Sequence, residues 1–219
     1  MNKTVELVTL WGKYEEDHPN ASIEDFCRHL LTSERESANT PDMVADNLGP
    51  IPVDGLLLRT ISKISRLNMM YVNLAFEGTG LNQIEEFGML LTIKRQGNPR
   101  KSEVIYDNML ELSSGTDMVN RLVKRGFITE HSDKEDKRAK RLRLTASGEK
   151  VFLKSFGKIA KSSKMLLQDM TVEDKKLCIQ LLKEVERKFF KRWTQDRTKE
   201  FEEIYKDVVS AKGGKEVGE

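Results

Sequence analysis

The feature that most limits the fold of this chain is a change of hydrophobic period at Gly126. Up to that glycine, apolar residues recur at helical spacing, with Val119 and Leu122 on the buried side and Gly126 as C-terminal cap. Beyond it, residues 127–131 have high β-propensity, and residues 141–145 alternate polar and apolar side chains. Two such segments on either side of a charged loop pair antiparallel. The sequence therefore predicts a helix that leads directly into a β-hairpin.

Most of the remaining chain has helical periodicity. Two predicted N-terminal signals are Asn82 with Glu85 three residues later, and Asn98 as cap with Pro99 in the first turn. We predict helices over residues 5–17, 23–36, 56–76, 82–96 and 98–110, one capped by Ser113 or Ser114, and two more capped by Thr145 and Thr171. The expected fold is mainly α with one small hairpin.

The charges are segregated along the chain, although the net charge is only +2. Residues 1–55 contain four basic and eleven acidic residues, a local charge of −7, so this segment would repel nucleic acid. Residues 120–143 contain nine basic and four acidic residues, a local charge of +5. A basic patch of this kind is the electrostatic footprint expected for a polyanionic partner.

The order of elements around this patch describes a winged helix-turn-helix: a helix, a short turn, a second helix with a polar outer side, and a basic hairpin. The second helix of such a motif fits the major groove of double-stranded DNA, where base edges can be distinguished, and nearby cations neutralise phosphates. Each candidate contact on this helix can reach a base or a phosphate. The candidates are Ser113, Ser114, Thr116, Asn120 and Arg121.

Three further residues near this helix have more than one interpretation. Three roles are open for Asp117: it accepts a hydrogen bond from a cytosine base, it orients Arg121 one turn away, or it disfavours binding to unsuitable DNA sequences. Lys101 and Lys124 are ordinary surface lysines by type, and their positions suit contacts with the DNA backbone. All three belong to the predicted DNA-binding set.

The run from Ser113 to Glu149 closely resembles the recognition helix and wing of the MarR family of bacterial transcriptional regulators. Asp136-Lys137-Arg138-Ala139 matches the Asp-x-Arg signature of that family's wing, and Arg143-Leu144-Thr145 with Gly148 matches its Leu-Thr-x-x-Gly ending. The resemblance covers Leu56 to about Trp193, so the acidic N-terminal segment is an extension beyond it.

This resemblance implies roles for the residues of the wing. It places Arg138 at the wing tip as a groove contact, with Asp136 near enough to orient it. The other basic residues of the wing are then expected to neutralise phosphates; they are Lys134, Lys137, Lys140 and Arg141. It also implies a homodimer on a roughly palindromic operator, with half-sites about one helical turn apart.

The resemblance and the periodicity together predict the organisation of the chain. The segments are an acidic helical extension (1–55), a dimerisation or linking helix (56–80), the winged helix-turn-helix (81–145), C-terminal dimerisation helices (146–197) and a tail (198–219) whose last ten residues are flexible. MarR-like proteins often bind small molecules between the helical dimerisation region and the DNA-binding lobe. The residues that border this space are Met69, Met70, Tyr71 and Phe87, which are otherwise core residues.

Other function classes find little support. The sequence lacks a nucleophile elbow, a phosphate-cradling loop and a metal-ligand spacing, so we predict neither an enzyme nor a cofactor or metal. No leader or membrane span is predicted, and Cys27 and Cys178 suit a reducing cytoplasm. Whether either cysteine is redox-active stays open. The alternative to a DNA-binding regulator is a winged-helix module that binds another protein through its acidic N-terminal helices.

Overall fold

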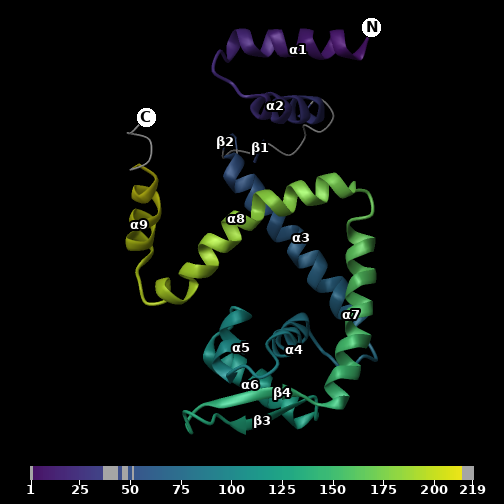
Figure 1. Cartoon of the computed structure of the whole chain (residues 1–219), viewed down its shortest axis with the longest axis vertical. Coiled ribbons are helices and arrows are strands. Elements are labelled where there is room, and N and C mark those ends of the chain that lie inside the picture. Colours follow the sequence, from purple (N-terminus) through teal and green to yellow (C-terminus); the bar gives the residue numbers. More distant parts are fainter. Residues whose placement is uncertain (1, 37–43, 46–48, 51, 214–219) are drawn as a thin grey trace. The chain divides into compact units, whose positions relative to one another are not determined.

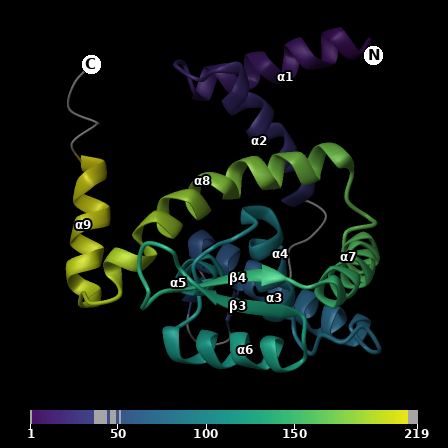
Figure 2. The same cartoon turned by 60° about the horizontal axis from the view of Figure 1, so that its bottom comes forward.

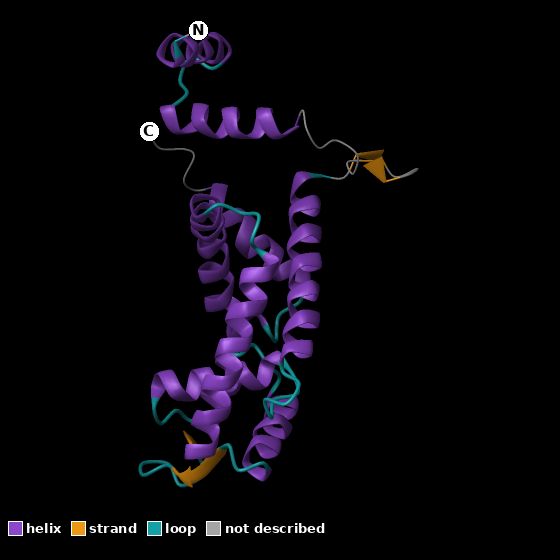
Figure 3. Cartoon of the chain, turned by 90° about the vertical axis from the view of Figure 1, so that its right-hand side faces the viewer, coloured by secondary structure: helices purple, strands orange, loops and turns teal. Residues whose placement is uncertain are grey.

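The computed structural model describes residues 2–36, 44–45, 49–50 and 52–213. The chain divides into two compact units, Met1–Lys63 and Ile64–Glu219, which are described separately. In sequence order the elements are α1 (Lys3–Asp17), α2 (Ile23–Glu36), β1 (Val44–Ala45), β2 (Gly49–Pro50), α3 (Val53–Ala75), α4 (Ile84–Gln96), α5 (Lys101–Asp107), α6 (Leu112–Lys124), β3 (Ile128–Ser132), β4 (Lys140–Leu144), α7 (Ala146–Leu166), α8 (Val172–Asp196) and α9 (Phe201–Gly213) (Figures 1 and 3). The predicted mainly α class with a small hairpin is confirmed.

The first unit is a helical hairpin with a small aromatic core. Asn2 caps α1, because its Oδ1 accepts from the backbone N–H of Thr4 at 3.0 Å. Phe26 of α2 is buried, and Trp11 of α1 meets it edge to face with ring centroids 5.2 Å apart. β1 and β2 pair antiparallel over two residues each. The helices predicted over 5–17 and 23–36 are present.

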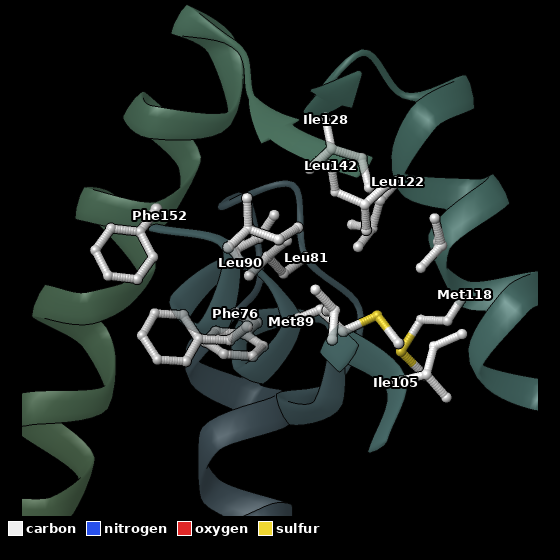
Figure 4. Packing of buried hydrophobic residues seen from close by; sticks show 14 of the residues in the cluster. Phe76, Leu81, Met89, Leu90, Ile105, Met118, Leu122, Ile128, Leu142 and Phe152 are labelled. Carbon is white, nitrogen blue, oxygen red and sulfur yellow. The ribbon is translucent and has the colours of Figure 1, made fainter. Parts of the chain in front are cut away.

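The core of the second unit joins the hairpin to the helices around it (Figure 4). Ile128 of β3 and Leu142 of β4 are buried with Leu122 of α6 in one hydrophobic cluster. Phe87 of α4 stacks on Phe152 of α7 with ring centroids 5.1 Å apart. Burial of large aliphatic and aromatic side chains at about 1.5–3 kcal/mol each is what holds α4, α6 and the hairpin together.

Helix ends follow the predicted signals at three places. Gly126 has a φ of 73°, and the amide of Phe127 reaches back to the carbonyl oxygen of Leu122 at 3.0 Å, a Schellman-type end for α6. Thr145 caps α7 and Thr171 caps α8 through their side-chain oxygens. Each of these contacts is local, so the sequence was sufficient to predict it.

Two predicted helix starts are wrong. α4 begins at Ile84, and Glu86 rather than Glu85 accepts from the backbone N–H of Asn82, at 2.9 Å. α5 begins at Lys101, with Arg100 as its N-cap residue, because the Asn98 side chain accepts a hydrogen bond from Arg143 of the wing instead of capping a helix. The helix ends at Asp107.

The N-cap residue of α6 is Glu111, which makes no side-chain cap hydrogen bond. Ser113 and Ser114 therefore lie in the first turn of the helix and are not its caps.

The last helices leave apolar side chains exposed on the single chain. Phe156 of α7 and Leu91 of α4 are 56% and 44% exposed. A row of apolar residues along α8 is also exposed; it comprises Leu177, Leu181, Leu182, Val185 and Phe189. We did not predict α9, which lies in the segment assigned to the tail. Of the ten residues predicted to be flexible, 214–219 lie outside the described residues. Among the described helices, none combines the length and apolarity that a bilayer crossing requires.

Candidate nucleic-acid interface

The helix-turn-helix consists of α5 and α6, and a glycine determines how closely they pack. Gly115 of α6 is buried, and a Cβ atom added there would lie 2.5 Å from Cγ2 of Ile105 on α5. In the turn between the helices, Met109 has a φ of 54°, and the N–H of Leu110 donates to the carbonyl oxygen of Ile105 at 3.1 Å. The close approach and the left-handed turn residue hold α6 against α5.

The outer side of α6 carries the predicted DNA contacts. The helix buries Met118, Val119 and Leu122 on its other side. The exposed residues are Ser113, Ser114, Asp117, Asn120, Arg121 and Lys124, and Thr116 is half-buried. The structure therefore brings the whole predicted helix set to one polar surface.

Lys101 connects the recognition helix to the wing. Its Nζ donates to Oδ1 of Asn120 at 3.1 Å and to Oε1 of Glu130 on β3 at 2.7 Å. The side chain of Lys101 is only 18% exposed, so this lysine is less open to solvent than a simple surface lysine. The contact uses the acceptor oxygen of Asn120, so the N–H donors of that amide remain for a base.

The wing is the β3–β4 hairpin, whose register runs from Ile128↔Leu144 to Ser132↔Lys140. The strands lie beside α6 and their connecting loop spans residues 133–139 (Figure 2). Lys134 and Lys137 are exposed on this loop. Lys140 is exposed at the start of β4, and its Nζ donates to Oγ of Ser132 at 3.3 Å. The basic hairpin next to the recognition helix is thus present.

Asp133 organises the start of the wing loop, and its side chain is only 1% exposed. Oδ1 accepts from the backbone N–H groups of Glu135 at 2.8 Å and Asp136 at 3.1 Å. Oδ2 accepts from Nε of Arg100 at 3.3 Å and from Nε of Arg141. The hydrogen bonds from the Asp136 and Glu135 amides, followed by that from Arg141, hold the pKa of this carboxyl well below its ordinary value of 3.8.

Asp136 acts on the wing tip through the backbone. Its Oδ1 accepts from the backbone N–H of Arg138 at 3.0 Å. The guanidinium of Arg138 is exposed and makes no ion pair within the part of the chain that the structure describes. Asp136 therefore shapes the loop that carries Arg138 and leaves the arginine charge open to a partner.

Arg141 has an internal role that differs from the predicted phosphate contact. Besides Asp133, its guanidinium binds the carbonyl oxygen of Asn98 at 2.7 Å, and Nε of Arg143 donates to Oδ1 of Asn98 at 3.2 Å. Asn98 is consequently an anchor for the wing, which is why it does not cap α5. We assign Arg141 to the positioning of the wing and not to the set of outward charges.

A second buried carboxylate fixes the far end of the recognition helix. Glu86 of α4 accepts from Nη2 of Arg125 at 2.5 Å, and Nη1 of Arg125 donates to the carbonyl oxygen of Gly80 at 2.8 Å. The side chain of Glu86 is 1% exposed. Because a buried charge is costly without a partner, this pair ties the C-terminal end of α6 to α4.

A cavity of about 220 Å³ separates the recognition helix from the wing. Thr116 of α6, Lys101 of α5 and Arg138 of the wing loop all line it. The two helices of the motif and the wing tip therefore meet around one hollow with a basic rim.

The four predicted ligand-binding residues do not share one environment. Phe87 is a core residue, Tyr71 is half-buried, and Met69 and Met70 are exposed at 39% and 47%. None of them lines the cavities of about 220, 320 and 570 Å³ in the described part of the chain. Their role as ligand contacts remains a prediction from the resemblance.

The residues that sequence reasoning missed are the ones that hold the wing in place: Asp133, Arg100 and Asn98. One signal was available, because Asp133 is an acidic residue within the most basic stretch of the chain. Arg100 and Asn98 are more than thirty residues away from it, and only the fold brings them to the carboxylate or its arginine partner.

A helix-turn-helix followed by a two-stranded wing places this protein in the winged-helix class. No family model and no curated protein matches the sequence. Solved structures do match. One is a mutant MarR from E. coli complexed with operator DNA, with a TM-score of 0.55 and 21% identity over 59% of this chain and 92% of the other.

Two more solved structures agree with this assignment. Another MarR structure has a TM-score of 0.57 and 21% identity over 66% and 95% of the two chains. A Pseudomonas aeruginosa protein described as a probable transcriptional regulator has a TM-score of 0.56 and 16% identity over 61% and 99%. At these identities the likeness establishes the fold. The chain has the fold of MarR-family transcriptional regulators, as the wing motif predicted.

Proposed function

We propose that this protein is a transcriptional regulator that binds double-stranded DNA in a sequence-specific manner. The observation that carries the proposal is the polar outer side of α6 beside a basic wing whose Arg138 is exposed. In this interpretation α6 enters the major groove, where Asn120 and Arg121 suit adenine and guanine. Arg138 reaches the adjacent minor groove, whose negative potential attracts arginine.

The regulator is proposed to act as a homodimer. The exposed apolar row of α8, defined above, supports this, because large apolar patches on a soluble chain mark interaction surfaces. A two-fold pair of winged lobes would contact half-sites about 34–36 Å apart on a roughly palindromic operator. A ligand that favours one separation of the lobes would change operator affinity by its preference for that arrangement.

Binding to fragments of the source genome at several salt concentrations tests the function. A regulator selects a small set of fragments, and log K falls with log salt at a slope of about −0.9 for each phosphate neutralised. The competing function, a protein-interaction module, predicts no selected sequence and no steep salt dependence. That second outcome would exclude the regulator.

A further inference from the structure

Asn120 of α6 has a hydrogen-bond partner that limits what its side chain can offer to DNA. Its Oδ1 accepts from Nζ of Lys101, the first residue of α5, at 3.1 Å. The same Nζ donates to Oε1 of Glu130 on β3 at 2.7 Å. Side chains of three elements therefore meet at one ammonium group, and Asn120 is the exposed end of this network.

The network fixes which end of the Asn120 amide remains available. The side chains of Lys101 and Glu130 are only 18% and 26% exposed, so this ion pair is less screened by water than a pair on an open surface. A lysine has three donors and no acceptor, so the atom of Asn120 that faces it is the oxygen. The amide cannot turn round without losing this bond. The Nδ2 group is therefore the part of Asn120 that a base can use.

This arrangement changes the base that suits Asn120. A free asparagine side chain pairs with adenine, because its oxygen accepts from N6 and its nitrogen donates to N7. Here the oxygen is already engaged, and adenine could reach only its second lone pair. The N6 amino group would then lie beside the Lys101 ammonium, with donor facing donor. Adenine is consequently disfavoured.

Guanine fits the same network without this conflict. In the major groove it presents two adjacent acceptors, N7 and O6, and no donor. Asn120 offers the two hydrogens of Nδ2, and Nζ of Lys101 has a third hydrogen that no described residue accepts. All the groups that face the base are then donors, as two acceptors require.

We propose that Lys101 is a positioning residue that changes the base preference of Asn120 from adenine to guanine. The inference rests on the proposed function and deepens it, because it names the base pair at one position of the operator. A lysine that only neutralised a phosphate would give a different result, since its loss would weaken all sequences alike. A change of preference at a single base pair distinguishes the two roles.

Selection from a random duplex library, followed by affinity measurements on single-base variants of the selected site, tests the proposal. Asn120→Ala identifies the relevant base pair, because the preference at that pair alone should disappear. At this pair we expect the wild-type protein to prefer G·C over A·T about tenfold, a typical discrimination for one bidentate contact. A preference for A·T, or no pair whose preference depends on Asn120, would overturn the proposal.

Lys101→Met removes the donor and keeps the length of the side chain. The preference at the same pair should move from G·C to A·T, while the other positions of the site keep theirs. Lys137→Met is the matched control, because Lys137 is an exposed lysine of the wing loop. It should weaken binding to all fragments alike and leave the preference at this pair unchanged. A retained preference for G·C in Lys101→Met, or an equal change in both variants, would refute the positioning role.

A second variant covers the possibility that Lys101→Met is poorly folded. Loss of the lysine leaves the partly buried carboxylate of Glu130 without its cation, which destabilises a protein. The double variant Lys101→Met with Glu130→Gln removes both charges and should show the same move toward A·T. Urea unfolding verifies that each variant is folded. A folded double variant that still prefers G·C would also refute the role.

The network can be measured without DNA. The side-chain NH₂ resonances of Asn120, identified by their loss in Asn120→Ala, should move in Lys101→Met and stay in place in Lys137→Met. Unmoved resonances in Lys101→Met would overturn the proposal. If no fragment is selected, the proposed function fails and the guanine preference fails with it, while the resonances still decide whether Lys101 holds Asn120. If a site is selected and its preference does not respond to Lys101, the positioning role alone is wrong.

Discussion

At the scale of single residues, two buried carboxylates hold the helix-turn-helix and the wing in place. Asp133 accepts hydrogen bonds from Arg100, the N-cap residue of α5, from Arg141 of β4 and from two backbone amides of its own loop. Glu86 likewise accepts a hydrogen bond from Arg125, at the C-terminal end of α6. Removing one partner of such a buried pair leaves an uncompensated charge, so these residues are more sensitive to substitution than the exposed lysines.

Asp133→Asn should destabilise the fold at neutral pH and loosen the wing. The folded-state pKa of Asp133 lies below the ordinary value of 3.8, so its contribution to stability is fully present above that value. As the pH falls below 3.8, the unfolded state takes up the proton first and the contribution is lost. Urea unfolding of both proteins at pH 7 and near pH 3 checks this. A difference in stability that grows toward acid pH would contradict the assigned role.

Arg138→Ala should weaken binding to the preferred DNA fragment by about 1–3 kcal/mol if this arginine reads the groove. The fold should be unaffected, because Arg138 is exposed and its contact with Asp136 is made by the backbone. Fluorescence anisotropy with the selected fragment measures the loss. Lys175→Ala, on α8, is the control for the general effect of one positive charge. Unchanged binding in Arg138→Ala would remove the wing from the DNA contact.

At the scale of elements, the geometry of the helix-turn-helix depends on the close approach of α6 to α5. Gly115 is the residue that permits it, since a Cβ atom would collide with the branched side chain of Ile105. Ile105 is fully buried, so it has little room to move. The hairpin is attached to the same core through Ile128 and Leu142, which makes helix and wing one packed body.

Gly115→Ala should therefore destabilise the protein by about 1–3 kcal/mol, although alanine favours helices. Gly157→Ala in α7 is the matched control, because a Cβ atom there would meet nothing within 4 Å. That variant should be stabilised by about 0.5–1 kcal/mol. Thermal or urea unfolding of both variants gives the comparison. Equal and favourable effects at the two positions would show that α5 and α6 pack less closely than described.

At the scale of the whole molecule, the single chain does not cover all of its apolar surface. The row along α8 and several residues of α7 remain exposed, while the core lies around α4, α6 and the hairpin. A helix with one apolar face gains most of its stability from packing, so α8 needs a partner surface. The proposed homodimer supplies one.

Leu181→Lys should shift the protein from dimer to monomer, because it places a charge in the middle of the apolar row. Lys183→Ala, on the opposite side of α8, should leave the association unchanged. Sedimentation velocity over a range of protein concentrations measures both. A monomeric wild-type protein, or a Leu181→Lys variant that associates as the wild type does, would contradict the dimer interface.

Local signals in the sequence predicted much of the fold. The cap residues Thr145 and Thr171, the terminating Gly126 and the alternating strands are correct, because each depends on neighbours within a few residues. The outer side of α6 followed from helical periodicity in the same way. The start of α5 was misplaced because Asn98 binds Arg141 and Arg143, more than forty residues away.

The sequence alone determined the helix-turn-helix, the wing and the residues that face outward from them, since periodicity and capping depend on residues only a few positions apart. Only the tertiary structure decided which charged residues serve the protein internally. Arg141 and Lys101 look like phosphate contacts until Asp133 and Glu130 are brought beside them. Tertiary packing brings each charged residue to a partner that is distant in the sequence, so a local sequence pattern cannot predict the pair.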